Sequence, residues 1–159
     1  MPIDYESIWE TMIAHTSRGD WSPHGPNHWK NVERNGLQLA RLNGADETII
    51  RLFAVFHDVE RQSEGTDPGH GARAAELVEQ LYGHNLLAAG VDLETLLDAC
   101  RGHNDGLTSS DLTIGTCWDA DRMDLPRVGI TPKPEKMSTP HGKAYAIDGP
   151  SALDPKRQG

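Results

Sequence analysis

This chain of 159 residues has few cysteines and no long apolar run, and both shortages narrow its class. Its two cysteines, Cys100 and Cys117, form no CxxC motif, so a disulfide framework of the secreted kind is not expected. No apolar run is long enough to cross a bilayer. The first residues also lack the basic start and apolar segment of a secretion signal. We therefore expect a cytoplasmic protein that has no membrane partner.

Positive charge is also scarce. The chain has 15 lysines and arginines against 24 acidic residues, a formal net charge of −9. Sequence-independent binding to a nucleic acid polymer needs a basic surface, so the composition disfavours it. A small phosphorylated substrate remains compatible with this charge, because a few local cations can override the net field. The length predicts one domain over residues 1–150 with a flexible tail at 151–159, and leaves a homo-oligomer open.

Apolar residues recur at helical spacing through most of the chain, and the predicted fold class is all-α. Six helices are expected, over about residues 4–16, 27–42, 46–58, 70–82, 92–103 and 110–124. The fourth should stop at Gly83. From Gly129 onward, prolines at 132, 134, 140, 150 and 155 argue against a long regular element. We expect an irregular C-terminal segment there that lies over the domain.

The third predicted helix is apolar on nearly every side, and the stretch then ends in His57 and Asp58. A helix that is apolar all round is a buried helix, so its end should place an imidazole and a carboxylate at or inside the core. Such groups are costly to bury without a partner, and a divalent metal ion would satisfy both. Alternatively, this helix end lies at the surface and both side chains meet water.

Four other predicted helices each carry one histidine or aspartate on the apolar side: His28, His70, His103 and Asp121. A single histidine in such a place is most often a core residue bonded to a carbonyl. Several of them converging from separate helices is how helical bundles build metal sites. Nitrogen and oxygen ligands without thiolate suit iron, manganese, zinc, nickel or cobalt. His24, in the loop before His28, is a rival ligand.

Three stretches taken together resemble the HD-domain superfamily of metal-dependent phosphohydrolases. They are HWKNV at 28–32, AVFHD at 54–58 and DADRMD at 119–124. The resemblance covers roughly residues 27–129 and implies an all-α bundle of about six helices. It also implies one or two divalent ions, with magnesium added to the metals above. The first ion would be bound by four residues: His28, His57, Asp58 and Asp121. A second ion, or the substrate phosphate, would be bound by His70 and His103.

The resemblance implies hydrolysis of a nucleotide or another small phosphate ester by metal-activated water. Asp58 would also orient that water or take up its proton, and Glu60 is a second acid–base candidate. Basic side chains that could meet the substrate phosphate are Lys30, Arg61, Arg122, Lys133 and Lys136. Two alternatives stay open: a di-iron oxygenase of the HD type that uses the same six ligands, and a non-catalytic domain that binds a nucleotide.

Overall fold

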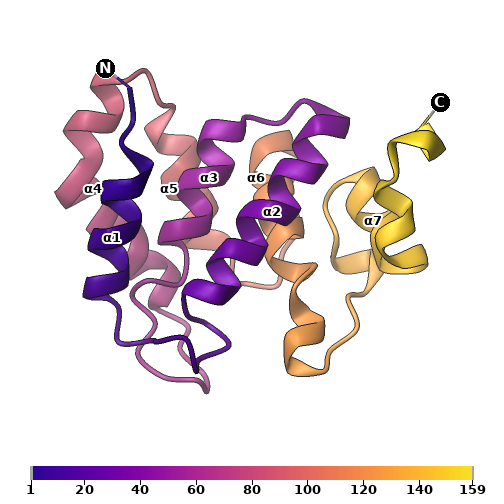
Figure 1. Cartoon of the computed structure of the whole chain (residues 1–159), viewed down its shortest axis with the longest axis horizontal. Coiled ribbons are helices and arrows are strands. Elements are labelled where there is room, and N and C mark those ends of the chain that lie inside the picture. Colours follow the sequence, from indigo (N-terminus) through magenta and orange to yellow (C-terminus); the bar gives the residue numbers. More distant parts are fainter. Residues whose placement is uncertain (1, 159) are drawn as a thin grey trace.

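The most apolar stretch of the sequence forms the central helix of a computed structural model that describes residues 2–158 (Figure 1). This helix, α3, spans Glu47–Phe56 and contacts the five helices α1, α2, α4, α5 and α6. Its start is capped by Asp46, whose carboxylate accepts hydrogen bonds from the backbone N–H groups of Thr48 and Ile49. From Leu52 onward every side chain of α3 is fully buried, so the prediction of a buried helix is confirmed.

The other helices pack around α3, except for the last, which lies against α2 and α6; no strand occurs within the described part of the chain, as the all-α prediction requires. They are α1 (Tyr5–His15), α2 (Pro26–Asn43), α4 (His70–Ala88), α5 (Leu93–Gly102), α6 (Leu112–Arg122) and α7 (Pro140–Asp148). Short 3₁₀ helices follow α6 and α7: η1 (Leu125–Val128), η2 (Pro134–Lys136), η3 (Gly149–Leu153) and η4 (Pro155–Gln158). Over residues 2–158, every helix is too short or too polar to span a lipid bilayer.

Helix α4 is longer than predicted. It passes through Gly83, where a stop was expected, and ends at Ala88. The reason is that Gly83 keeps an ordinary helical backbone and is buried beside Leu93, so it does not supply the left-handed turn that ends a helix. That turn falls at Gly90 instead, where φ is +85°.

The C-terminal segment is also more regular than predicted, because it contains α7. Pro140 occupies the first turn of this helix, where proline is tolerated, and Thr139 caps the start by accepting a hydrogen bond from the N–H of Gly142. Ala152 and Leu153, within the predicted tail, are buried. The segment packs against the ends of α2 and α6 through a second core cluster: Leu39, Met123, Met137 and Leu153.

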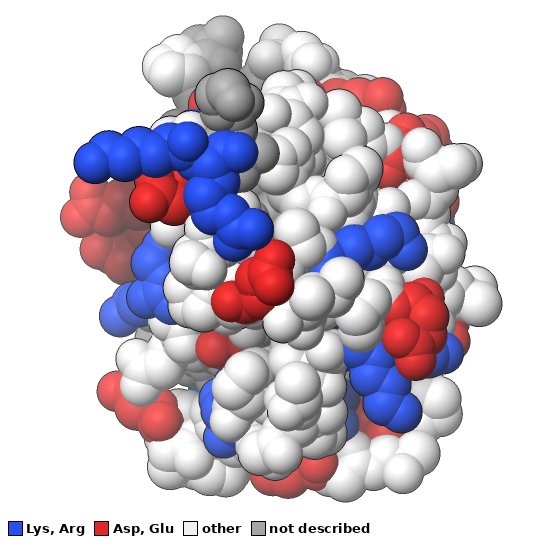
Figure 2. Space-filling view, turned by 90° about the vertical axis from the view of Figure 1, so that its right-hand side faces the viewer, with Lys and Arg blue, Asp and Glu red and all other residues white. Residues whose placement is uncertain are grey.

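Figure 2 views the molecule from the C-terminal side. On that face lysine and arginine side chains are interspersed with acidic ones and separated by uncharged residues. This mixed pattern differs from the continuous basic surface on which nucleic acid binds.

A buried carboxylate holds the C-terminal segment to α6. Asp119 is fully buried and accepts hydrogen bonds from the N–H of Ser138 (2.6 Å), the N–H of Thr139 (2.8 Å) and the hydroxyl of Thr139 (2.7 Å). A Cβ on Gly142 would lie only 2.1 Å from a carboxylate oxygen of Asp119, so α7 approaches this group as closely as glycine allows. The position of the segment therefore depends on Asp119.

Replacing Asp119 with alanine should lower the free energy of unfolding by about 3 kcal/mol, because three donors lose a buried acceptor. Asp98→Ala is the control. Its carboxylate is exposed and pairs with Arg101 one turn away, and the loss should be less than about 0.5 kcal/mol. Denaturant unfolding monitored by circular dichroism measures both. Equal losses in the two variants would contradict the assigned role of Asp119.

Candidate metal centre

Three helices bring four predicted ligands together at the end of α3. The Nε2 atoms of His28 and His57 lie 3.2 Å apart, and each lies 3.4 Å from Oδ2 of Asp58. On α6, Oδ1 of Asp121 lies 3.0 Å from Nε2 of His28 and 3.6 Å from that of His57. The first set of predicted ligands therefore converges from α2, α6 and the end of α3.

A second cluster shares Asp58. Its Oδ1 atom lies 3.0 Å from Nε2 of His70, the first residue of α4, and 3.2 Å from Nε2 of His103, directly after α5. The two Nε2 atoms are 2.9 Å apart. One oxygen of Asp58 thus faces each histidine pair, so the carboxylate can bridge two ions.

These spacings suit metal ions. Ligand atoms at about 2.1 Å from one ion lie about 3.0 Å apart at right angles and about 3.4 Å apart in a tetrahedron. Two clusters of three buried residues satisfy this condition, with Asp58 common to both: His28, His57 and Asp58, and Asp58, His70 and His103. Asp121 extends the first cluster to the predicted four.

Hydrogen bonds at the far side of each ring fix which nitrogen faces the centre. The Nδ1 atoms of His57, His70 and His103 lie against backbone carbonyls, which only accept, so each Nδ1 carries the proton. His28 donates from Nδ1 to Asp124 at 2.7 Å. Each Nε2 is therefore the nitrogen that faces inward. Two Nε2 atoms at 2.9–3.2 Å repel unless a proton or a metal ion lies between them, so the donor set fits a metal.

The pKa shifts of two of these residues also indicate that the centre favours a cation. Burial alone would lower the pKa of His28, but the carboxylates of Asp121, Asp124 and Asp58 outweigh it and raise that pKa to about 10. Burial alone would raise the pKa of Asp58, yet the surrounding imidazoles, led by His57, hold it well below its usual range. The three carboxylates around His28 and the imidazoles around Asp58 therefore favour positive charge at the centre, which a proton on His28 or a bound cation supplies.

A cleft of about 150 Å³ opens above the two clusters. Its walls carry three guanidinium groups, from Arg61, Arg122 and Arg127, and the amide of Asn104. Arg61 donates to the carbonyls of Ser63 (2.9 Å) and Gly65 (2.6 Å), which fixes its position in the loop before α4. The cleft thus combines acidic ligands at its base with fixed cations at its walls.

The loops at 16–25 and 61–69 lie side by side below the bundle and are held together by Glu64 (Figure 1). Glu64 accepts hydrogen bonds from Arg18 at 2.7 Å and from the Ser22 hydroxyl at 2.7 and 2.9 Å. This contact places His24, the rival ligand of the sequence analysis, with Nδ1 at 3.4 Å from Oδ2 of Asp58. His24 lines the cleft but lies outside both three-residue clusters.

Four predicted site residues lie elsewhere. Glu60 pairs with His15 of α1 and does not line the cleft. Lys30 is exposed on α2 and does not line it either. Lys133 and Lys136 are likewise absent from its lining, although the carbonyl of Lys136 accepts a hydrogen bond from Arg122.

Three residues of the site were not assigned a role from the sequence. Asp124 orients the ring of His28 and also accepts from Asn31 at 3.2 Å. The sequence does indicate a role for Asp124, since it follows Asp121 by three positions and helical spacing puts the two on one side. Arg127 and Asn104 line the cleft from segments without periodicity, so no pattern could have identified them.

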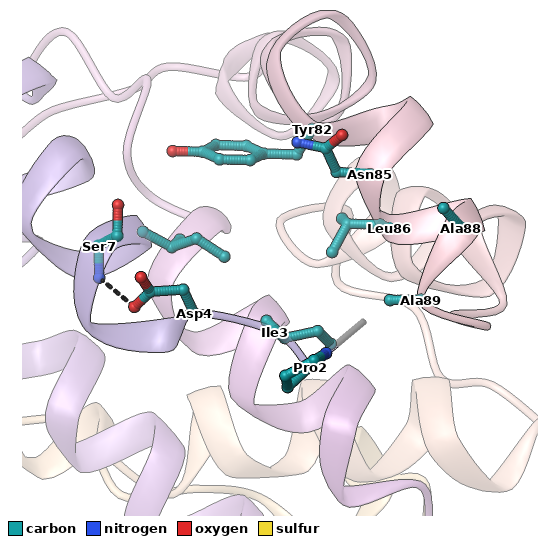
Figure 3. A pocket seen from close by; sticks show the side chains of 10 residues that line it. Pro2, Ile3, Asp4, Ser7, Tyr82, Asn85, Leu86, Ala88 and Ala89 are labelled. Carbon is teal, nitrogen blue, oxygen red and sulfur yellow. Dashed lines mark hydrogen bonds between the residues drawn. The ribbon is translucent and has the colours of Figure 1, made fainter.

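A larger hollow of about 310 Å³ lies far along α4, between its C-terminal half and the start of α1 (Figure 3). Tyr82, Asn85 and Leu86 face Ile3 and Ser7 across it. Its surface is mostly apolar, and it contains none of the predicted site residues. Size alone therefore does not locate the functional site of this molecule.

No protein-family model matches the sequence, and no curated protein matches it. One solved structure does: the crystal structure of a predicted HD superfamily hydrolase from an uncultured Thermotogales bacterium. The identity is 25% and the TM-score 0.70, over 96% of this chain and 88% of the other. The helical bundle and its shared-aspartate cluster thus define a class of helical domains whose buried histidines and aspartates could hold metal ions. Within that class, this chain has the fold of the HD-domain superfamily, as the sequence motifs predicted.

The approach of α4 to α5 sets the spacing of the second cluster, and Gly71 permits it. A Cβ at this position would lie 2.5 Å from the carbonyl oxygen of Cys100. We expect Gly71→Ala to cost about 1–3 kcal/mol and to separate His70 from His103. Gly83→Ala, in the same helix, meets only ordinary contacts at 3.7 Å and should be neutral or mildly stabilising. Denaturant titrations compare the two variants, and a stable Gly71→Ala protein would refute the close-packing argument.

Proposed function

We propose that this protein is a metal-dependent phosphohydrolase that acts on a small phosphate ester. The observation that carries the proposal is the carboxylate of Asp58, shared between two histidine pairs at the base of a cleft walled by arginines. Acidic and imidazole ligands below and guanidinium groups above fit a phosphoryl group held between cations. The likeness to a predicted HD superfamily hydrolase supports the same chemistry.

Each part of the site has a distinct task in this proposal. Ions held by the two clusters would activate a water molecule near neutral pH and neutralise phosphate charge. Arg61, Arg122 and Arg127 would bind the phosphoryl oxygens, and two carbonyl contacts already hold Arg61 in place. Asp58 would fix the separation of the two ligand sets. His24 would contact the substrate from the cleft wall, where its ring lies beside Asp58.

The substrate class follows from the cleft. A nucleotide is one candidate, because its terminal phosphate could enter while the base stays at the mouth. A nucleic acid polymer fits poorly, given a formal net charge of −9. A panel of nucleotides and small phosphate esters, assayed with manganese, iron, cobalt, nickel, zinc and magnesium, would identify both substrate and metal.

Asp58→Ala should lower phosphate release at least about 100-fold. Losing a group that only orients a metal ligand already costs about 10–100-fold, and Asp58 belongs to both clusters. Elemental analysis of the same protein should show metal content falling with activity. Glu60→Gln is the control, since Glu60 lies outside the cleft, and should keep activity within about threefold. Undiminished turnover in Asp58→Ala would overturn the proposal, and so would wild-type protein that neither holds metal nor releases phosphate.

A second candidate function, a di-iron oxygenase, is favoured by one observation. The bridging carboxylate and the five ligand residues around it make six, enough to hold two irons with open positions. Oxygen consumption on addition of substrate to protein containing two irons, without phosphate release, would establish this alternative. Phosphate release with a redox-inactive metal such as zinc would exclude it.

A further inference from the structure

Three residues that line the cleft each have a buried polar atom without a hydrogen-bond partner among residues 2–158. One is Nδ1 of His24, which lies 3.4 Å from Oδ2 of Asp58. The other two atoms are Nη2 of Arg122 and Oδ1 of Asn104. Buried polar groups are nearly always satisfied, so each orphan atom needs an explanation. Of the last two atoms, one is a donor and the other an acceptor, and both residues line the space above the clusters. A ligand bound there would have to offer the complementary groups to both.

Arg122 is held so that only part of its guanidinium is satisfied. The residue is 9% exposed, and its Nη1 donates to the carbonyl of Lys136 at 2.5 Å. That bond fixes the plane of the guanidinium and leaves Nη2 without an acceptor. A buried, positively charged donor calls for an anionic oxygen, which a phosphoryl group supplies.

In Asn104 the hydrogen-bond donor has a partner and the acceptor has none. Its Nδ2 donates to the carbonyl of Pro68 at 2.9 Å, and turning the amide over would place two oxygens against each other. Oδ1 therefore stays the free end, close to the backbone of Gly71, where a Cβ would lie 2.7 Å away. An unpaired acceptor calls for an O–H or N–H group. A phosphate dianion carries neither, so the phosphoryl group cannot satisfy Asn104.

We propose that the substrate is a phosphomonoester carrying a hydroxyl group near the phosphate, of the size of a polyol or sugar phosphate. The phosphate would meet Arg122, and the hydroxyl would donate to Oδ1 of Asn104. The cleft volume agrees, because about 150 Å³ is small beside the roughly 300–1,000 Å³ of common ligand pockets. This inference rests on the proposed phosphohydrolase function and narrows its substrate class.

The test uses two non-hydrolysable compounds that differ by one hydroxyl: 3-hydroxypropylphosphonate and propylphosphonate. Calorimetric titration of the metal-loaded protein gives the affinity for each. We expect the hydroxylated compound to bind about tenfold more tightly, the ratio that one satisfied buried hydrogen bond produces. Equal affinities would overturn the inference and show that solvent satisfies Asn104.

Three variants assign the effect to residues. Asn104→Leu removes the acceptor at similar volume and should bring the affinity ratio of the two compounds close to one. Arg122→Leu should weaken both compounds together and keep their ratio, because both carry the phosphonate. Asn85→Leu, in the separate hollow of Figure 3, is the matched control and should keep the wild-type ratio. A ratio that survives in Asn104→Leu would overturn the assignment.

The outcomes separate this inference from the proposed function. Phosphate release with equal affinities for the two phosphonates would remove only the hydroxyl requirement. Failure to bind either phosphonate, together with no release from any phosphate ester, would remove the phosphohydrolase proposal as well. If Asn104→Leu does not fold, the wild-type comparison still decides.

Discussion

The interaction on which the rest depends is the contact of one buried carboxylate with inward-facing imidazoles. Asp58 directs one oxygen toward the pair His28 and His57, and the other toward His70 and His103. Hydrogen bonds donated by Nδ1 fix the rings from behind, so their Nε2 atoms face one another at 2.9–3.2 Å, a separation that suits two ligand atoms of one metal ion. Positive charge at this place stabilises the arrangement, and α2, α4, α6 and the ends of α3 and α5 supply the residues.

The sequence was informative wherever a ligand lies on a regular helix with one apolar side. A residue such as His28 or Asp121 can then be assigned to the core side from its spacing alone. The same rule explains why Lys30 lies outside the site. Lys30 follows His28 by two positions, about 200° around the helix, so it lies on the opposite side from the core. Its charge made it a candidate, but its spacing does not support that role. Glu60 lies past the end of α3, where spacing no longer gives direction, and it faces His15 instead.

What could not be predicted depends on contacts between distant segments. The cleft wall includes Arg61, whose side chain is directed by two carbonyls of an irregular loop, and Arg122, which is held by the carbonyl of Lys136. Every residue has a backbone carbonyl, so residue type does not show which carbonyls accept these hydrogen bonds. The sequence therefore indicates these arginines as candidates but does not predict where their side chains point. The prolines after residue 129 predicted a less regular segment than the structure has, because Pro140 begins α7 and does not break it.

Helix α6 shows how the C-terminal segment becomes part of the site. Residues 119 and 122 lie about 60° apart around this helix, and residue 121 lies on another side. Asp121 can thus face the metal ligands while Asp119 and Arg122 together hold the turn at 136–139. The segment has none of the ligands, yet it satisfies one end of the Arg122 guanidinium and leaves the other toward the cleft. The position of the Arg122 guanidinium in the cleft is therefore set partly by a stretch that contributes no residue to either histidine–aspartate cluster.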